Sequence, residues 1–248
     1  MTTDKRTPAR NTAANVLWEN VKQIGLAVIL ALFIKTSVVE AYKIPTASME
    51  DTLLIGDFLL ANKFVYGARL PLVDWRLPAI SEPERGDVVI FLFPGDGITK
   101  YIKRCVAVPG DTVLVKNKAL FVNGDRFPDS AYAKYVDTTR TGQQNVHRRR
   151  AGGQDSRDFF GPYIVPPNCY FMMGDNRDNS YDSRYWQAVP KDLILGEAIM
   201  VHWSWNESEY PSPQVTVDDP LSVPRLFAYN VVHFVQKVRW DRLFNLIS

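Results

Sequence analysis

Ser48 lies in a short turn, residues 44–49, that follows the one strongly apolar run near the N-terminus. A serine hydroxyl becomes a nucleophile only when a neighbouring base removes its proton. The three histidines (147, 202 and 233) lie far apart in the sequence, and their spacing matches neither a zinc site nor a histidine-based catalytic site. We therefore expect the base to be a lysine, a carboxylate or an amino terminus.

Lys103 is the lysine that we consider for this role. An ordinary lysine has a pKa of ~10.4, so its amine accepts a proton from serine at neutral pH only when burial lowers that pKa. Residues 101–106 alternate like a strand, which puts Lys103 on one face with Tyr101 and Cys105. If that face meets the core, Lys103 is a base; if it meets water, Lys103 is an ordinary strand lysine. The spacing alone leaves both interpretations open.

A polar loop, residues 174–184, directly follows the apolar residues 170–173 and holds five charged residues in eleven. Such a loop either binds a metal ion or is held by its own side chains. Calcium would need carboxylates at alternate positions and a terminal Glu, which this loop lacks, and its two arginines would repel the ion. We therefore expect arginine–carboxylate bonding, with Asp182 and Arg184 as a charge pair, and neither a metal nor a cofactor.

The composition indicates a folded protein. The chain has 248 residues, of which 46% are hydrophobic and 23% charged, enough to build a proper core. The net charge of +2 and the dispersed basic residues argue against a nucleic-acid partner. The one basic run, residues 147–150, is either a solvated loop or a contact for phosphate or anionic lipid. Cys105 and Cys169 are either free thiols or one bridge.

The N-terminal segment predicts a cytoplasmic tail, residues 1–15, and a transmembrane anchor, residues 16–40. Residues 25–34 are continuously apolar, but a span needs ~20 apolar residues to cross ~30 Å of hydrocarbon. The flanking residues supply the missing length, with Trp18 at the interface and lysines reaching outward.

A cleaved secretory signal is the alternative for this segment. The long, acid-containing stretch before residue 25 and the late small residues favour a retained anchor. Lysines and arginines near the N-terminus keep that end cytoplasmic, which places the rest of the chain outside the cytoplasm.

From residue 42 onward, short apolar runs alternate with Gly, Pro, Asn and Asp, a texture typical of antiparallel β-structure. We expect a mainly β fold, with the core in residues 41–115 and 163–215 and a smaller, partly irregular cap inserted at 116–162. Asn123 and Gly124 predict a type I′ hairpin turn. The predicted strands are residues 53–55, 58–61, 87–93, 100–108, 112–115, 119–122, 163–165, 169–173 and 193–203.

The C-terminal segment, residues 216–248, is predicted to be amphipathic. Helical spacing puts five apolar residues on one side: Phe227, Val231, Phe234, Val235 and Val238. One interpretation is an element packed on the body of the protein. The other is a basic amphipathic element on an anionic membrane, which Trp240 and Phe244 would suit.

Five short motifs, in order, resemble the boxes of bacterial type I signal peptidases, also called leader peptidases. The resemblance covers roughly residues 42–201, and the order of the motifs makes it specific. The motifs are Thr46-Ala47-Ser48-Met49, Gly56-Asp57, residues 85–89, residues 101–104 with 109–111, and residues 174–180 with 182–184.

The resemblance implies a role for each matching residue. Ser48 matches the nucleophile and Lys103 the general base of a Ser/Lys dyad. The Thr46 hydroxyl and the Ser48 amide match the oxyanion hole, and Ser180 matches a residue that orients the lysine amine. Met49, Asp182 and Arg184 match residues that support the site. Cys105 departs from the usual small residue, and it either tunes Lys103 or fills space.

The resemblance also implies a function. It is that of a serine endopeptidase that is anchored in the bacterial inner membrane by a single pass, with its N-terminus cytoplasmic and its catalytic domain on the periplasmic face. Such an enzyme removes signal peptides from exported preproteins, cutting after a small-x-small pattern, with secretory preproteins and the lipid bilayer as partners. Two alternatives stay open: another Ser/Lys protease, such as a self-cleaving repressor-type enzyme or a conjugation-transfer peptidase, and a non-enzymatic membrane-tethered β-domain.

Overall fold

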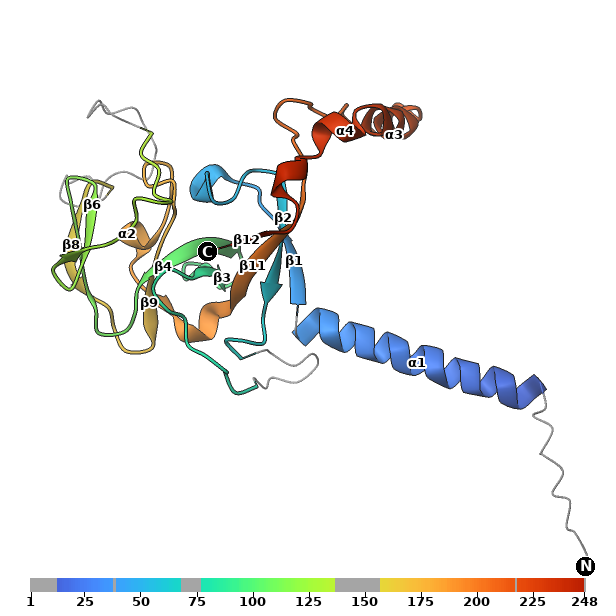
Figure 1. Cartoon of the computed structure of the whole chain (residues 1–248), viewed down its shortest axis with the longest axis horizontal. Helices are drawn as coiled ribbons and strands as arrows, with labels where there is room; N and C mark the ends of the chain where they lie inside the picture. The colour runs from blue at the N-terminus through green and yellow to red at the C-terminus, as the bar shows by residue number, and fades with distance from the viewer. Residues whose placement is uncertain (1–12, 38, 68–76, 137–156, 217, 248) are drawn as a thin grey trace, which may run out of the picture.

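The computed structural model consists of a β-rich body from which two helices extend on the same side (Figure 1). It describes residues 13–37, 39–67, 77–136, 157–216 and 218–247. The basic run at 147–150 and most of the predicted tail lie outside these residues. The antiparallel sheets confirm the predicted mainly β fold, which is one part of the predicted fold class.

Helix α1, Ala13–Ser37, covers most of the predicted anchor and projects away from the body (Figure 1). Within the described residues, no helix combines the length and the hydropathy that a membrane span requires. The predicted spanning helix is therefore not seen. The residues needed to lengthen the ten-residue apolar run include Glu19 and Lys22, which form an ion pair on the helix surface.

The large sheet has the strand order β1-β2-β11-β3-β4-β9-β10, with β12 paired to β11. All of its ladders are antiparallel. Short elements α2, Ser183–Trp186, and η2, Lys191–Leu193, lie between β9, β10 and β11. The strands are β1 Val39–Lys43, β2 Asp57–Asn62, β3 Val88–Leu92, β4 Lys100–Ala107, β9 Cys169–Met173, β10 Val189–Pro190, β11 Ile194–Ser204 and β12 Asn245–Leu246.

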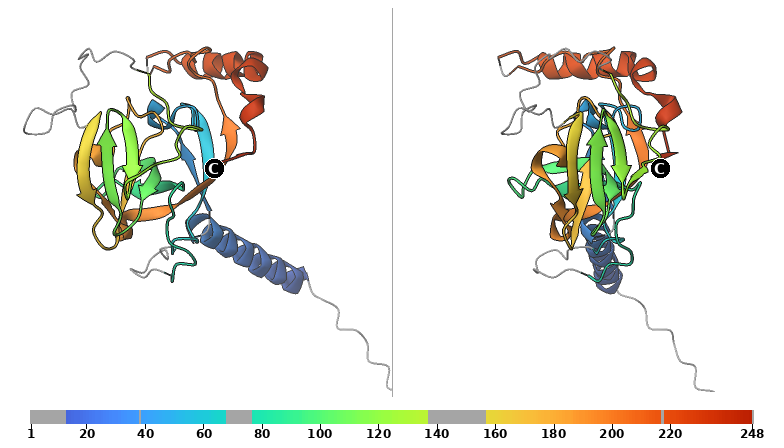
Figure 2. Two further views of the ribbon diagram at one scale, coloured as in Figure 1. Left: turned by 60° about the vertical axis from the view of Figure 1, so that its left-hand side comes forward. Right: turned by 90° about the vertical axis from the view of Figure 1, so that its left-hand side faces the viewer.

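A second sheet, in the order β7-β6-β5-β8, is inserted between β4 and β9, two strands that pair with each other. Figure 2 shows it standing to one side of the large sheet. It begins at residue 112, four residues before the predicted insertion, because the turn at 109–111 ends β4. Asn123 and Gly124 have φ of 55° and 91°, which confirms the type I′ turn. The strands are β5 Thr112–Lys116, β6 Ala119–Val122, β7 Asp125–Arg126 and β8 Phe159–Ile164.

The strand predicted at residues 53–55 is wrong. These residues form a turn whose one fully buried side chain is Leu53. The Leu53 amide donates to Met49 O (2.6 Å), and the next amide donates to Asp57 Oδ2 (2.8 Å). Only one side chain of this apolar run, Leu53, is fully buried. Backbone amides of the run donate to Met49 O and to the Asp57 carboxylate rather than to a neighbouring strand.

The C-terminal segment forms α3, Ser222–Val232, α4, Phe234–Lys237, η3, Trp240–Arg242, and the short strand β12. Arg239 and Arg242 attach it to the buried Asp57. The interpretation in which the apolar side packs on the body does not hold for the whole stripe, because Phe227, Val231 and Val235 are exposed.

Candidate active site

Ser48 lies at the centre of the one-turn helix η1, Ala47–Met49, five residues after the end of β1. Thr46 is extended, with φ −132° and ψ 155°, and brings the chain into this turn. Met49 is 2% exposed and belongs to the core cluster that also buries Leu53. Met49 therefore anchors the turn in the core, while the neighbouring Ser48 side chain stays accessible to solvent.

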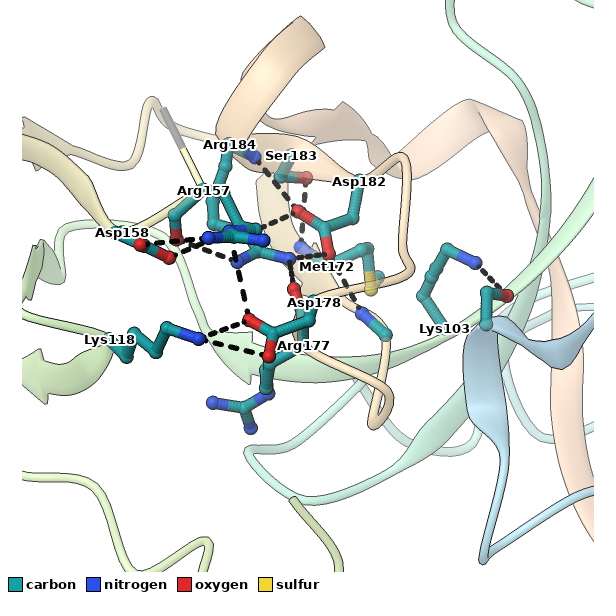
Figure 3. Close-up of polar contacts among 12 residues, drawn as sticks. Lys103, Lys118, Arg157, Asp158, Met172, Arg177, Asp178, Asp182, Ser183 and Arg184 are labelled. Atoms are coloured by element: carbon teal, nitrogen blue, oxygen red, sulfur yellow. Dashed lines mark hydrogen bonds and ion pairs between the residues drawn. The ribbon is translucent and has the colours of Figure 1, made fainter. Parts of the chain in front are cut away.

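Lys103 lies in the middle of β4, and its Nζ is 2.5 Å from Ser48 Oγ (Figure 3). Although β1 and β4 are four positions apart in the strand order, the sheet curls so that they approach each other. The ion pair between Lys100 and Glu40 (2.8 Å) joins the same two strands. The curl is the feature that brings the two residues together, and Lys103 is only 4% exposed.

Burial lowers the pKa of the Lys103 ammonium from its ordinary range to about 8. The carboxylates of Asp182 and Asp175 oppose this shift, and the nearby Arg184 guanidinium adds to it. About one Lys103 side chain in ten is therefore neutral at pH 7, far more than for an ordinary lysine. Its amine can accept a proton from the hydroxyl that it contacts.

Thr46 is the other hydroxyl at this position, with Oγ1 at 3.4 Å from Ser48 Oγ. Both residues line a cleft of about 560 Å³. One wall is formed by the end of β1 and the Ser48 turn, and the other by β4 and residues 178–181. Thr46 is exposed to this cleft, where a hydroxyl can donate to a bound oxygen.

The loop 174–184 is held by its own charged side chains (Figure 3). Arg184 donates from Nε and Nη2 to the two oxygens of Asp182, both at 2.8 Å, which confirms the predicted charge pair. Arg184 also donates to the carbonyls of Arg157 and Arg177. The Gly174 amide donates to Asp182 Oδ2 (3.1 Å), so the pair fixes the start of the loop as well as its end.

A second buried pair, Arg104 with Asp175, was not singled out from the sequence. Arg104 Nε and Nη2 donate to the two Asp175 oxygens at 2.9 and 2.8 Å, and both side chains are at most 1% exposed. Thr52 Oγ1 also donates to Asp175 (2.6 Å). This pair therefore links β4, the loop after β9 and the turn after Ser48. The only sequence signal was that Arg104 follows Lys103 and that Asp175 lies in the polar loop 174–184.

The backbone of the loop also contacts the Ser48 turn directly. The Asn176 amide donates to Ser48 O (3.1 Å). A Cβ on Gly174 would lie 2.5 Å from Ser48 O and 2.3 Å from Ser180 Oγ. Residue 174 must therefore be glycine for the loop to come this close.

Ser180 lines the same cleft and is 7% exposed. Its hydroxyl forms no hydrogen bond of standard geometry among the described residues. The structure thus brings Ser180 to the site without the expected bond to the Lys103 amine.

The two cysteines are free. Cys105 is fully buried in a cluster with Phe91 and Met172, and burial raises the pKa of its thiol. Its surroundings match the space-filling interpretation. Among the residues that the structure describes, no group of three or more His, Cys, Asp or Glu side chains could hold a metal ion.

Comparison with known proteins connects this geometry to a family. The family described as signal peptidase, peptidase S26, matches residues 17–203. Signal peptidase I of Pseudomonas aeruginosa is 36% identical over 239 residues, which cover 88% of this chain and 80% of the relative. Signal peptidase I of Pseudomonas fluorescens is 38% identical over 77% of this chain and 74% of its own. Signal peptidase I of Aquifex aeolicus is 30% identical over 87% of this chain and 94% of its own.

Proposed function

The chain belongs to the signal peptidase family, peptidase S26, and is a serine peptidase, and we propose that it removes signal peptides from exported preproteins with a dyad of Ser48 and Lys103. Family membership excludes the non-enzymatic β-domain. The observation that carries the dyad is the 2.5 Å contact between Lys103 Nζ and Ser48 Oγ, with the lysine buried and the serine accessible.

The reaction follows from these positions. Neutral Lys103 removes the Ser48 proton as Ser48 Oγ attacks the scissile carbonyl carbon. The oxyanion accepts hydrogen bonds from the Ser48 amide and the Thr46 hydroxyl, each of which is typically worth ~3 kcal/mol in the barrier. The Lys103 ammonium then gives its proton to the leaving amine. Water, deprotonated by the same lysine, then attacks the acyl carbonyl carbon, and the Lys103 ammonium returns that proton to Ser48 Oγ as the ester bond breaks.

The supporting residues have separate roles in this proposal. Asp182 and Arg184 hold the loop that carries Ser180, and Met49 holds the turn that carries Ser48. Ser180 orients the Lys103 amine once a bound substrate has tightened the site, since catalytic hydrogen bonds are often longer without substrate.

The cleft suits an extended peptide. Its walls are the ends of two strands, β1 and β4, whose backbones can pair with an added segment. β1 is an edge strand, with β2 as its partner in the sheet. Strand addition holds the substrate backbone, and the side chains beside the nucleophile then select small residues in the small-x-small pattern.

We also place the protein at the inner membrane through α1. Its apolar side chains are exposed: Val16, Leu17, Val21, Ile24, Leu26, Val28, Ile29 and Leu30. Lipid is the medium that would cover such a surface, and the body then works on the periplasmic face. Flotation with vesicles tests the attachment. Cysteine labelling from each side of the membrane tests the orientation.

The decisive experiment supplies a secretory precursor to the purified full-length protein in detergent. Ser48→Ala and Lys103→Ala are each expected to lose at least ~10³-fold in processing rate, because each removes half of the dyad. Lys116→Ala is the matched control, because Lys116 is an exposed strand lysine outside the cleft. Undiminished processing by either dyad variant would contradict the assignment.

A further inference from the structure

A helix on a protein surface usually packs its apolar side against the protein and exposes its polar side. In helix α3, most of the apolar side chains are exposed instead. Two of its polar side chains are turned toward the neighbouring parts of the C-terminal segment: Ser222 is 2% exposed and donates to Asp219 O (2.6 Å), and Asn230 Oδ1 accepts from Lys237 Nζ (3.1 Å) and Ser212 Oγ (3.2 Å). We call the exposed set Val223, Phe227, Val231, Val232 and Val235 the apolar face of α3–α4; these side chains are 59–74% exposed.

The basic residues of this segment are occupied by contacts within the protein. Lys237 is fully buried and bonds to Ser212, Asn230 and Glu207. Arg242 bonds to the buried Asp57. Arg225 alone stays largely exposed, and it pairs with Asp219. The expected basic surface for an anionic membrane is therefore not present on the described segment, which leaves an apolar surface with little charge of its own.

The position of α3 indicates what covers its apolar face. Helices α1 and α3 both extend from the same side of the β-body (Figure 1). Figure 1 shows α1 lengthwise and α3 nearly end-on, whereas Figure 2 shows α3 lengthwise and α1 foreshortened. The axes of α1 and α3 therefore run in clearly different directions. A bilayer whose surface lies across the side from which α1 projects would have α3 lying along that surface. Trp240, which is 52% exposed and contacts Phe234 and Val235 of α4, is a side chain typical of the interface.

We propose that the apolar face of α3–α4 inserts into the acyl boundary of the bilayer as an in-plane helix, a second lipid contact of the protein besides α1. This inference rests on the membrane attachment proposed for α1. Because the nearby cations are occupied, insertion is driven by apolar burial rather than by attraction to anionic headgroups. A depth of ~5–10 Å, typical of such helices, would bury the five side chains.

Site-specific fluorescence tests this proposal in the full-length protein on phosphatidylcholine vesicles, in a Cys169→Ser background. An environment-sensitive dye is attached at Val231→Cys, in the apolar face. Asp125→Cys, exposed on β7 of the small sheet, is the matched control. Nitroxide lipids are expected to quench the dye at position 231 several-fold more than the dye at position 125, and aqueous iodide to quench it less. Replacing part of the lipid by phosphatidylglycerol should change this by less than twofold.

Three results would overturn the proposal. Equal quenching at positions 231 and 125 would show that α3 stays in water. Self-quenching at 231 without lipid quenching would assign the face to a second copy of the chain. Strong dependence on anionic lipid would assign the binding to charge.

A dye at Leu26→Cys reports the α1 attachment separately, and precursor processing by each labelled variant reports the enzyme. Lipid quenching at 26 but not at 231 would therefore overturn this inference alone.

Discussion

Asp57 and Arg242 are 185 residues apart in sequence, and Arg242 Nη2 donates to Asp57 Oδ2 at 2.6 Å. Asp57 is fully buried at the start of β2, and the same guanidinium group also donates to Thr52 O (2.9 Å). Arg239 adds a bond to Ile55 O (3.0 Å). The C-terminal segment therefore holds the turn that follows Ser48 from its outer side.

Arg242→Ala is expected to lower the free energy of unfolding by about 2 kcal/mol, because it removes charged hydrogen bonds from a buried carboxylate that keeps other partners. Chemical denaturation measures this loss. Arg225→Ala is the control: this arginine is 63% exposed in its ion pair, and its loss should cost less than ~0.5 kcal/mol. Equal effects of the two substitutions would show that the Asp57 contact adds no stability.

The rate of precursor cleavage should rise with pH and level off above about pH 8. The pKa of Lys103 is lowered to about 8 by burial, and only its neutral form accepts the Ser48 proton. Stability should rise with pH in a higher window, from about pH 8 to the ordinary lysine pKa of ~10.4, because there the unfolded chain still binds the Lys103 proton that the folded chain has lost. A profile of kcat/KM against pH checks the first statement. A rate independent of pH between 6 and 9 would contradict it.

Thr46→Val should lower kcat by ~10²- to 10³-fold with little change in KM, because the hydroxyl is assigned to the oxyanion rather than to the ground state. Thr46→Ser keeps the hydroxyl and should retain most of the activity. Steady-state kinetics on a peptide substrate separates the two parameters. If valine and serine behave alike, the Thr46 hydroxyl has no part in the oxyanion hole.

Gly174→Ala should impair both stability and catalysis. The added methyl group would lie 2.5 Å from Ser48 O, so the loop must move away from the turn that it contacts. Overpacking of this kind costs ~1–3 kcal/mol in unfolding free energy. Gly25→Ala is the control, since no atom lies within 4 Å of its added methyl group. Normal kinetics in the Gly174 variant would show that this approach does not position Ser48.

Most strands of both sheets could be predicted because alternation and turn residues are local properties. The prediction at 169–173 matches β9, and the Asn123-Gly124 turn has the expected backbone angles. The strand at 53–55 failed because three apolar residues are too few to reveal whether a strand or a single buried side chain explains them.

The site depended on information that is not local. Alternation predicted that Lys103 shares a face with Cys105, but the curl of the sheet decides that this face is buried against Ser48. The Arg104–Asp175 pair joins residues 71 positions apart, and no spacing rule connects them. Similarly, the helical period in the C-terminal segment predicted one apolar side without indicating whether protein or another medium lies against it.

The insertion of the small sheet has a consequence for how this architecture can change over time. The chain leaves the large sheet at the end of β4 and returns at β9, and these two strands are ladder partners. The inserted segment begins and ends at neighbouring positions of the large sheet. Its length therefore does not alter the pairing register of β4, the strand that places Lys103 opposite Ser48. Lineages can therefore lengthen or shorten the segment between β4 and β9 while the pairing that positions Lys103 is inherited, as long as the bond from Arg184 to the carbonyl of residue 157 is kept.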